Sequence, residues 1–228
     1  MYFSISHPLP LQLRITVKGP EALFELMRIA LCGWDVHRVD ANSEPLIEIV
    51  DEGKLSVVTS SFRSARAHSD LINTLNNTLI ALAYCVRDLK PHSMLLHAAA
   101  LKSSNGISVY FGPRKSGKSR YVAEQCLNGA VCIGDDLILY CKKSRLFEAL
   151  GLPVRLRRPI PSSILGKIDA SRILVGHSTC YLTEHVFSLM PAGQRFQPDR
   201  LFQLQPEYRV RALPMAKLGQ FLDQSIIQ

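Results

Sequence analysis

Eight consecutive residues near the middle of the chain match the phosphate-binding pattern G-x-x-x-x-G-K-[ST]. They are Gly112, Pro113, Arg114, Lys115, Ser116, Gly117, Lys118 and Ser119. Glycines let the backbone curl until successive N–H groups point at one phosphate. Lys118 is then expected to reach the β- and γ-phosphates, and the Ser119 hydroxyl to bind Mg²⁺. The pattern predicts a bound nucleoside triphosphate; the alternative is a Gly/Ser-rich turn with a solvated lysine.

Two adjacent carboxylates, Asp135 and Asp136, follow an apolar run 16 residues after Ser119. Phosphoryl transfer needs a carboxylate to take the proton of the acceptor hydroxyl, and often a second one near the metal. Adjacent side chains of a strand point to opposite faces, so different roles are expected for the two aspartates. The alternative is a turn-forming Asp-Asp pair after Gly134.

One histidine and one arginine extend this set of polar residues. His97 stands among alanines 15 residues before Gly112, where it could lie near the γ-phosphate or hold a carboxylate in place. Arg155 shares one face of a short predicted strand with Arg157, and an arginine near the γ-phosphate stabilises the charge that develops during transfer. The alternatives are a half-buried strand histidine with satisfied hydrogen bonds and a solvated basic edge strand.

The elements around the loop predict an unusual sheet. A short strand over residues 107–111 leads into the loop, and a helix over 121–127 leaves it. A further strand over 93–101 is joined to the first by the turn 103–106, which makes a hairpin. Ordinary P-loop NTPases carry this loop on a parallel sheet with helical crossovers, so the hairpin favours a mixed or antiparallel sheet.

The first 90 residues show no obvious chemistry and are expected to form a small α+β part with a scaffold or substrate-docking role. Its predicted elements are strands over 11–18, 46–50 and 54–59 and helices over 21–31 and 67–87. The last helix is expected to pack beneath the nucleotide domain, residues 91–228, with Asn73, Asn76 and Asn77 on its wet side. That domain continues with strands over 130–133, 137–141, 146–150, 152–157 and 207–213, further strands near Cys180 and Val186, and helices over 163–168 and 215–227.

Charge and cysteine usage narrow the range of partners. The net charge of this 228-residue chain is +8, and residues 142–172 contain eight basic and two acidic residues. Such a run favours a phosphate-bearing or acidic ligand. Interleaved aromatics and zinc spacings are missing, which argues against nucleic acid. The six cysteines never form C-x-x-C and are expected to be buried thiols of a reducing compartment. A start without basic residues and short apolar stretches predict a cytoplasmic protein with no membrane contact.

Together with the hairpin, His97, the loop at 112–119 and Gly134-Asp135-Asp136 resemble the catalytic domain of the HPr serine kinase/phosphorylase family. The resemblance covers roughly residues 93–158. The His-Ala-Ala-Ala strand and the segment Gly-Leu-Pro-Val-Arg-Leu-Arg look more like the lasso-peptide tailoring kinases of this group. Two positions depart from the family pattern, because Lys115 replaces a glycine and Pro153 replaces a glutamate that helps to hold metal.

The resemblance implies a phosphoenolpyruvate-carboxykinase-like nucleotide fold, which is an α/β (α+β) fold with the phosphate loop on a mixed sheet. It implies a kinase that uses ATP and Mg²⁺, with Asp135 as base, Asp136 near the metal beside Ser119, and His97 in the catalytic site. Lys118 and Arg155 are expected to bind the transferred group. The substrate would be a serine of a peptide or small protein, such as a lasso precursor peptide.

Three alternatives stay open. They are a kinase acting on an HPr-type protein, a catalytically inactive nucleotide-binding module, and an ATPase or GTPase of the ordinary P-loop type. Pro153 is the best support for the inactive module, and the hairpin argues against the ordinary NTPase. Homo-oligomerisation is compatible with the sequence.

Overall fold

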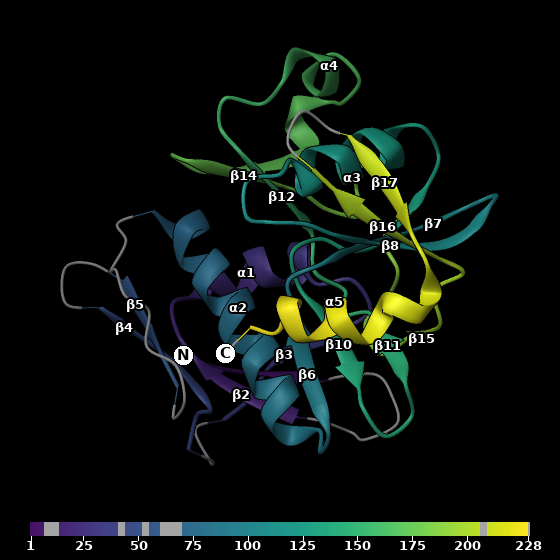
Figure 1. Cartoon of the computed structure of the whole chain (residues 1–228). Helices are drawn as coiled ribbons and strands as arrows, with labels where there is room; N and C mark the ends of the chain where they lie inside the picture. The colour runs from purple at the N-terminus through teal and green to yellow at the C-terminus, as the bar shows by residue number, and fades with distance from the viewer. Residues whose placement is uncertain (7–13, 41–43, 52–54, 60–69, 206–208, 228) are drawn as a thin grey trace.

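The computed structural model describes residues 1–6, 14–40, 44–51, 55–59, 70–205 and 209–227, and the strands within these ranges form four sheets (Figure 1). Two of these sheets contain both parallel and antiparallel pairs. The fold is α+β, with more strand than helix and with mixed sheets, and this level of the prediction is confirmed. None of the helices in these ranges has the length and apolar character needed to cross a membrane.

The first sheet belongs to the N-terminal part and has the strand order β3-β1-β2-β4-β5. Its strands are β1 (Tyr2–Ser6), β2 (Arg14–Lys18), β3 (Asp35–Arg38), β4 (Ile47–Asp51) and β5 (Leu55–Val58). Alternate side chains such as Phe3, Ile5 and Val17 are fully buried. Two helices pack with this sheet, α1 (Glu21–Ala30) and α2 (Leu71–Leu89). Residues 11–13, 54, 67–69 and 207–208 of the predicted elements lie outside the described residues.

The second sheet carries the candidate phosphate loop and has the order β17-β16-β8-β7-β9. Its strands are β7 (Ala99–Ser103), β8 (Gly106–Phe111), β9 (Val131–Gly134), β16 (Arg200–Leu204) and β17 (Val210–Leu213), and helix α3 (Lys118–Leu127) follows the loop. Strands β7 and β8 form the predicted antiparallel hairpin, whereas β16 pairs with β8 in parallel. The prediction of a mixed sheet at this loop is therefore confirmed.

The remaining two sheets are antiparallel and flank the loop-bearing sheet (Figure 1). One consists of β15 (Arg195–Phe196), β11 (Leu146–Glu148), β10 (Ile138–Cys141) and β6 (Ser93–Leu96), and the other of β12 (Val154–Arg157), β14 (Thr179–Leu182) and β13 (Ile173–Val175). The other helical elements are α4 (Ser162–Leu165), η1 (Ala170–Arg172), η3 (Met215–Lys217) and α5 (Leu218–Ser225). The strand expected near Val186 is wrong. That residue lies in a turn, and its N–H donates to the Thr183 carbonyl at 2.9 Å.

The strand predicted over residues 93–101 is wrong in one respect, since it is two strands in different sheets. β6 pairs with β10, and β7 pairs with β8 and β9. Between them the His97 N–H leaves the sheet pattern and donates to the carbonyl of Ser225 at 2.7 Å. The C-terminal segment therefore holds the chain at the point where it crosses from one sheet to the other.

The aspartate pair also departs from its prediction, because it is not part of a strand. β9 ends at Gly134 and β10 begins at Ile138. The Leu137 N–H donates to the Asp135 carbonyl at 2.9 Å, and Asp136 has φ of 73°. A turn of this kind removes the strand alternation, so the argument that the two carboxylates face opposite sides does not apply.

The largest apolar core crosses the boundary expected near residue 90. It contains most of the buried side chains of the first sheet, α1 and α2, and also Leu95, Leu139, Leu150, Leu152 and Tyr181 from later in the chain. The N-terminal part and the loop-bearing part thus share one continuous hydrophobic interior.

The six cysteines are free thiols; Cys141 is half-buried and the other five are buried.

Candidate functional site

The loop between β8 and α3 needs glycine for a steric reason that the structure makes explicit. A Cβ atom on Gly112 would lie 2.4 Å from the carbonyl oxygen of Leu204 in β16 and 2.9 Å from Ser116 Oγ. Gly117, directly before α3, has φ of 91°, a conformation that side chains with a Cβ rarely adopt. Lys115 takes a similar conformation, with φ of 68°, at the position where the resembling family has glycine.

Lys118 is buried at the first position of α3 and points back into the loop. Its Nζ donates to the carbonyls of Gly112 (2.9 Å) and Pro113 (3.1 Å) and lies 3.0 Å from His97 Nε2. Burial lowers the pKa of Lys118, while the charges of Asp136 and Asp135 oppose that shift. An ammonium group is therefore held at the loop within reach of both carboxylates.

His97 connects Lys118 to the aspartate turn. Its Nδ1 lies 3.0 Å from Asp136 Oδ1, on the opposite side of the ring from Lys118. Because an ammonium group only donates, Nε2 accepts from Lys118 and the ring proton sits on Nδ1, where it donates to Asp136. The predicted proximity of His97 to a carboxylate is present in the structure, and the histidine orients Asp136 toward the loop.

The two aspartates lie in different environments. Asp135 is buried, and burial together with the adjacent charge of Asp136 raises its pKa to about 7, against weaker opposing contacts from Arg155 and Ser119. Burial alone would raise the pKa of Asp136 as well, but the His97 hydrogen bond and the charges of Arg155 and Lys118 outweigh it and hold that pKa below its usual value. Asp136 is therefore an anion at neutral pH, and Asp135 takes up and releases a proton near neutrality.

One oxygen of Asp135 is free to react with a ligand. Its Oδ2 accepts a hydrogen bond from the backbone N–H of Arg155 at 3.1 Å, whereas Oδ1 is buried and has no hydrogen-bond partner among the described residues. A buried carboxylate oxygen without a partner is costly in a folded protein and calls for an explanation such as a ligand or ion. Oδ1 is the atom through which this site can act on a hydroxyl or bind a cation.

The residues at the loop fit a Mg²⁺ ion that arrives with a nucleotide. Among the described residues, no group of three or more His, Cys, Asp or Glu side chains could hold a metal ion by itself. Mg²⁺, however, is usually bound by one or two carboxylates together with substrate phosphates and waters. The anion Asp136 and the Ser119 hydroxyl supply ligands of that type, which leaves the unpartnered Oδ1 of Asp135 available for a hydroxyl.

Arg155 reaches the site from β12, and its side chain is held by residues that the sequence did not single out. Its Nη1 donates to Asn76 Oδ1 at 2.5 Å, and the Tyr181 hydroxyl donates to the same oxygen at 2.9 Å. The prediction of a water-facing side is wrong for Asn76 and Asn73, since Asn73 also accepts hydrogen bonds, from the hydroxyls of Ser178 and Thr179. Three asparagines within five residues of an otherwise apolar helix were the available signal for a polar contact surface.

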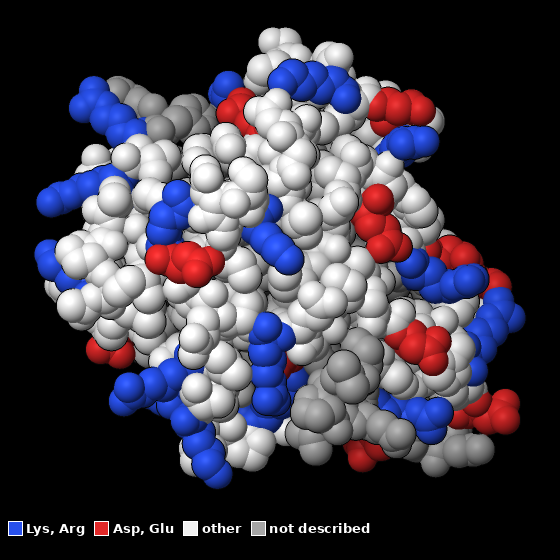
Figure 2. All heavy atoms as spheres, turned by 90° about the vertical axis from the view of Figure 1, so that its right-hand side faces the viewer, with Lys and Arg blue, Asp and Glu red and all other residues white. Residues whose placement is uncertain are grey.

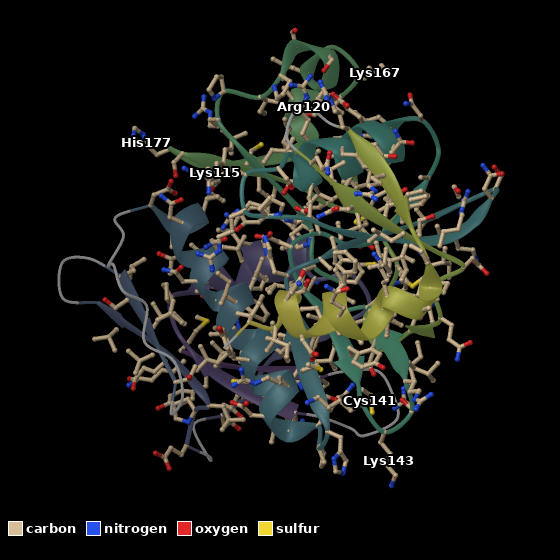
Figure 3. All side chains as sticks on the ribbon, viewed as in Figure 1. Lys115, Arg120, Cys141, Lys143, Lys167 and His177 are labelled. Carbon is tan, nitrogen blue, oxygen red and sulfur yellow. The ribbon has the colours of Figure 1, made fainter. Side chains whose placement is uncertain are left out.

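The basic run at residues 142–172 does not form one surface. Lys143, on the β10–β11 turn, and Lys167, after α4, lie at opposite ends of the molecule, while Lys115 and Arg120 lie on the same half as Lys167 (Figure 3). On the face seen in Figure 2, lysines and arginines are interspersed with acidic side chains. The eight basic residues of this run therefore do not form a single anion-binding surface.

The structure thus brings together seven of the predicted residues: His97, Gly112, Lys118, Ser119, Asp135, Asp136 and Arg155. Pro113, Arg114 and Lys115 are the exposed outer part of the loop, and Ser116 is buried beneath it. Comparison with protein-family models gave no match to this chain, and comparison with curated proteins gave none either. The arrangement of side chains around the loop is consequently the basis for what can be inferred about function.

Proposed function

We propose that this protein is an ATP- and Mg²⁺-dependent kinase that transfers the γ-phosphoryl group to a serine hydroxyl of a peptide or small protein. The observation that supports this most is the state of Asp135. Its carboxyl is buried, its pKa is raised to about 7, and its Oδ1 has no partner among the described residues. A base with a pKa near the working pH is the group that removal of a hydroxyl proton requires.

Each residue of the site has a role in this reaction. The N–H groups of the loop and Lys118 bind the β- and γ-phosphates, and Ser119 with Asp136 would hold Mg²⁺, which offsets phosphate charge when it is bound. The acceptor oxygen forms a bond to the γ-phosphorus as the bond from that phosphorus to the β–γ bridging oxygen breaks. The hydroxyl proton passes to Asp135 Oδ1, and ADP leaves.

His97 and Arg155 assist from the two sides of the aspartate turn. The imidazole of His97 holds Asp136 at 3.0 Å and keeps it ionised. Arg155 brings a permanent positive charge to the same site and can stabilise the oxygens of the transferring group. Replacing either residue is expected to reduce the rate of transfer more than the affinity for ATP.

The mixed sheet and the resemblance of the motifs support the class of acceptor and the finer fold assignment. A loop strand with an antiparallel neighbour, β7, and a parallel one, β16, is compatible with a phosphoenolpyruvate-carboxykinase-like nucleotide fold. The HPr-kinase-like motifs favour a serine acceptor, on a peptide such as a lasso precursor or on an HPr-type protein. The same antiparallel hairpin argues against an ordinary P-loop ATPase or GTPase.

A second candidate is a nucleotide-binding module that transfers no phosphoryl group. It is favoured by Pro153, which is buried directly before β12 at the position where the resembling family has a metal-binding glutamate. In that case the protein would bind ATP and act through the N-terminal part. This candidate predicts tight nucleotide binding without a phosphorylated product.

The test is incubation of the protein with Mg²⁺, γ-³²P-labelled ATP and a library of serine-containing peptides, with matched peptides that carry alanine instead. Label that appears only on serine peptides, and is lost in Asp135→Asn while ATP still binds, supports the kinase. Tight ATP binding with no labelled peptide or protein supports the module. Failure to bind ATP contradicts both candidates.

A further inference from the structure

Helix α2 contributes a polar side chain to the site from the N-terminal part of the chain. Asn76 lies in its second turn and is half-buried. Its Oδ1 is the shared acceptor for Arg155 Nη1 at 2.5 Å and for the Tyr181 hydroxyl at 2.9 Å. This hydrogen bond holds the guanidinium of Arg155 in place. The direction in which Arg155 points is therefore set by a residue 79 positions earlier in the chain.

The helix that carries Asn76 is itself fixed at both faces. On one face Leu75, Leu79 and Leu82 are buried in the largest core. On the other, Asp70 at its N-terminus accepts a hydrogen bond from the His177 N–H at 2.7 Å, and Asn73 accepts from Ser178 Oγ at 3.2 Å. These contacts attach α2 to the turn that connects β13 and β14, so Asn76 presents its oxygen from a rigid support.

The choice of an amide at this position has an electrostatic consequence. An amide oxygen orients a guanidinium without neutralising it, whereas a carboxylate at the same place would form an ion pair and reduce the positive field at the site. The charge of Arg155 already lowers the pKa of Asp136 and opposes the raised pKa of Asp135. Its field is therefore directed at the aspartate turn, where the transferring group is expected.

We propose that Asn76 is a positioning residue for Arg155, and that the N-terminal part thereby controls stabilisation of the transferring phosphoryl group. This inference rests on the proposed phosphoryl transfer. It extends the role of residues 1–90, which then complete the site in addition to any scaffold or docking role. It is independent of the identity of the acceptor, because the contact concerns the γ-phosphoryl group alone.

The test compares binding of ADP alone with binding of ADP, Mg²⁺ and aluminium fluoride, a planar mimic of the transferring group, by titration calorimetry. Arg155→Ala serves as the reference for loss of the arginine. Asn76→Ala is expected to weaken binding of the mimic by about tenfold, because the guanidinium loses its orientation, and to leave ADP affinity unchanged. Asn73→Ala is the matched control, since it removes the same side chain one turn earlier and its partners do not include Arg155.

Asn76→Asp separates positioning from simple structural support. Aspartate keeps the acceptor oxygen and the shape of asparagine, so the thermal midpoint should stay within a few degrees of wild type, yet binding of the mimic should fall at least as far as in Asn76→Ala. Wild-type affinity of Asn76→Asp for the mimic, together with a loss in Asn76→Ala, would support orientation by the acceptor oxygen and overturn the requirement for a neutral amide. Equal losses in Asn76→Ala and Asn73→Ala, or no loss in either, would overturn the proposal.

Failure of the proposed function is visible separately in the same experiment. If wild type binds the mimic no better than ADP, the phosphoryl-transfer site itself is contradicted and the inference falls with it. If wild type prefers the mimic but Arg155→Ala has no effect, the roles of Arg155 and Asn76 are overturned while the site stands. If the mimic behaves as expected but no serine peptide is phosphorylated, the acceptor class is wrong while the role of Asn76 stands.

Discussion

At the scale of single residues, Asp135 links the chemistry of the site to the stability of the protein. The folded carboxyl has its pKa raised from 3.8 to about 7, chiefly by burial. The folded state therefore binds more protons than the unfolded state between those two values, and stability falls as pH rises through that window. Above pH 7 the buried Asp135 carboxyl is ionised in the native protein, and its desolvation then destabilises the fold.

Asp135→Asn should consequently stabilise the fold at pH 8 and not at pH 4, since the amide is neutral at both. About 1 kcal/mol moves the thermal midpoint of a domain of this size by about 2–4 °C, so a rise of a few degrees is expected at pH 8. Thermal unfolding of both proteins across pH 4 to 8 measures the difference. A difference that does not change with pH would show that Asp135 is not buried as an anion.

Gly112 is the residue where the loop tolerates least change. A Cβ there would lie 2.4 Å from the backbone oxygen of Leu204, which belongs to the neighbouring strand and cannot rotate away. Gly112→Ala should therefore distort the loop and reduce ATP affinity by about tenfold or more, as measured by calorimetry. Gly219→Ala is the control, because an added Cβ there meets no atom within 4 Å, and this substitution should leave ATP affinity unchanged.

At the scale of elements, Asp70 fixes helix α2 to the turn that connects β13 and β14. Its Oδ1 caps the helix through the Ile72 N–H at 2.8 Å, and its Oδ2 accepts from the His177 N–H at 2.7 Å. Asp70→Ala removes both bonds and should lower the free energy of unfolding by about 1–2 kcal/mol, measured by urea titration. Asp169→Ala is a milder comparison, because that aspartate caps an exposed turn through Ser171 and pairs loosely with Arg172 of the same turn. Equal small losses in both variants would contradict the joining role of Asp70.

Local patterns predicted the elements around the loop, and the mixed sheet followed from one hairpin. Ladder partners far apart in sequence were not predictable, since nothing local indicates that β16 pairs with β8 across about 90 residues. The break at His97 was missed because the run from Met94 to Leu101 is apolar almost throughout, and such a run does not show where one sheet ends and another begins. The partners of Arg155 were missed because polar residues on a helix are normally expected to face solvent.

At the scale of the whole molecule, one buried ion pair joins the end of α2 to β11. Lys90 Nζ contacts Glu148 Oε1, both side chains are 7% exposed, and Arg195 Nε lies 3.5 Å from Glu148 Oε2. Removing Lys90 takes the buried counter-ion away from Glu148, and breaking a buried pair in this way typically costs about 3–5 kcal/mol. Together with the core that crosses residue 90, this pair should make the chain unfold as one unit.

Lys90→Met should lower the free energy of unfolding by about 3–5 kcal/mol in urea titrations, and the double substitution Lys90→Met with Glu148→Leu should recover much of that loss. Recovery is expected because the double variant contains neither charge of the buried pair. The transition should remain single in wild type. Two separate transitions, or a loss below about 1 kcal/mol in Lys90→Met, would contradict a shared interior.

The central claim is that Asp135 accepts the proton of a serine hydroxyl as the γ-phosphoryl group is transferred. The most direct measurement is single-turnover transfer from γ-³²P-labelled ATP to a serine peptide identified from the library, followed from pH 5.5 to 8.5 with wild type and Asp135→Asn. The account predicts a rate that rises tenfold per pH unit and levels off near pH 7, and at least about a hundredfold loss in Asp135→Asn with ATP affinity retained. Transfer by Asp135→Asn at the wild-type rate would contradict it.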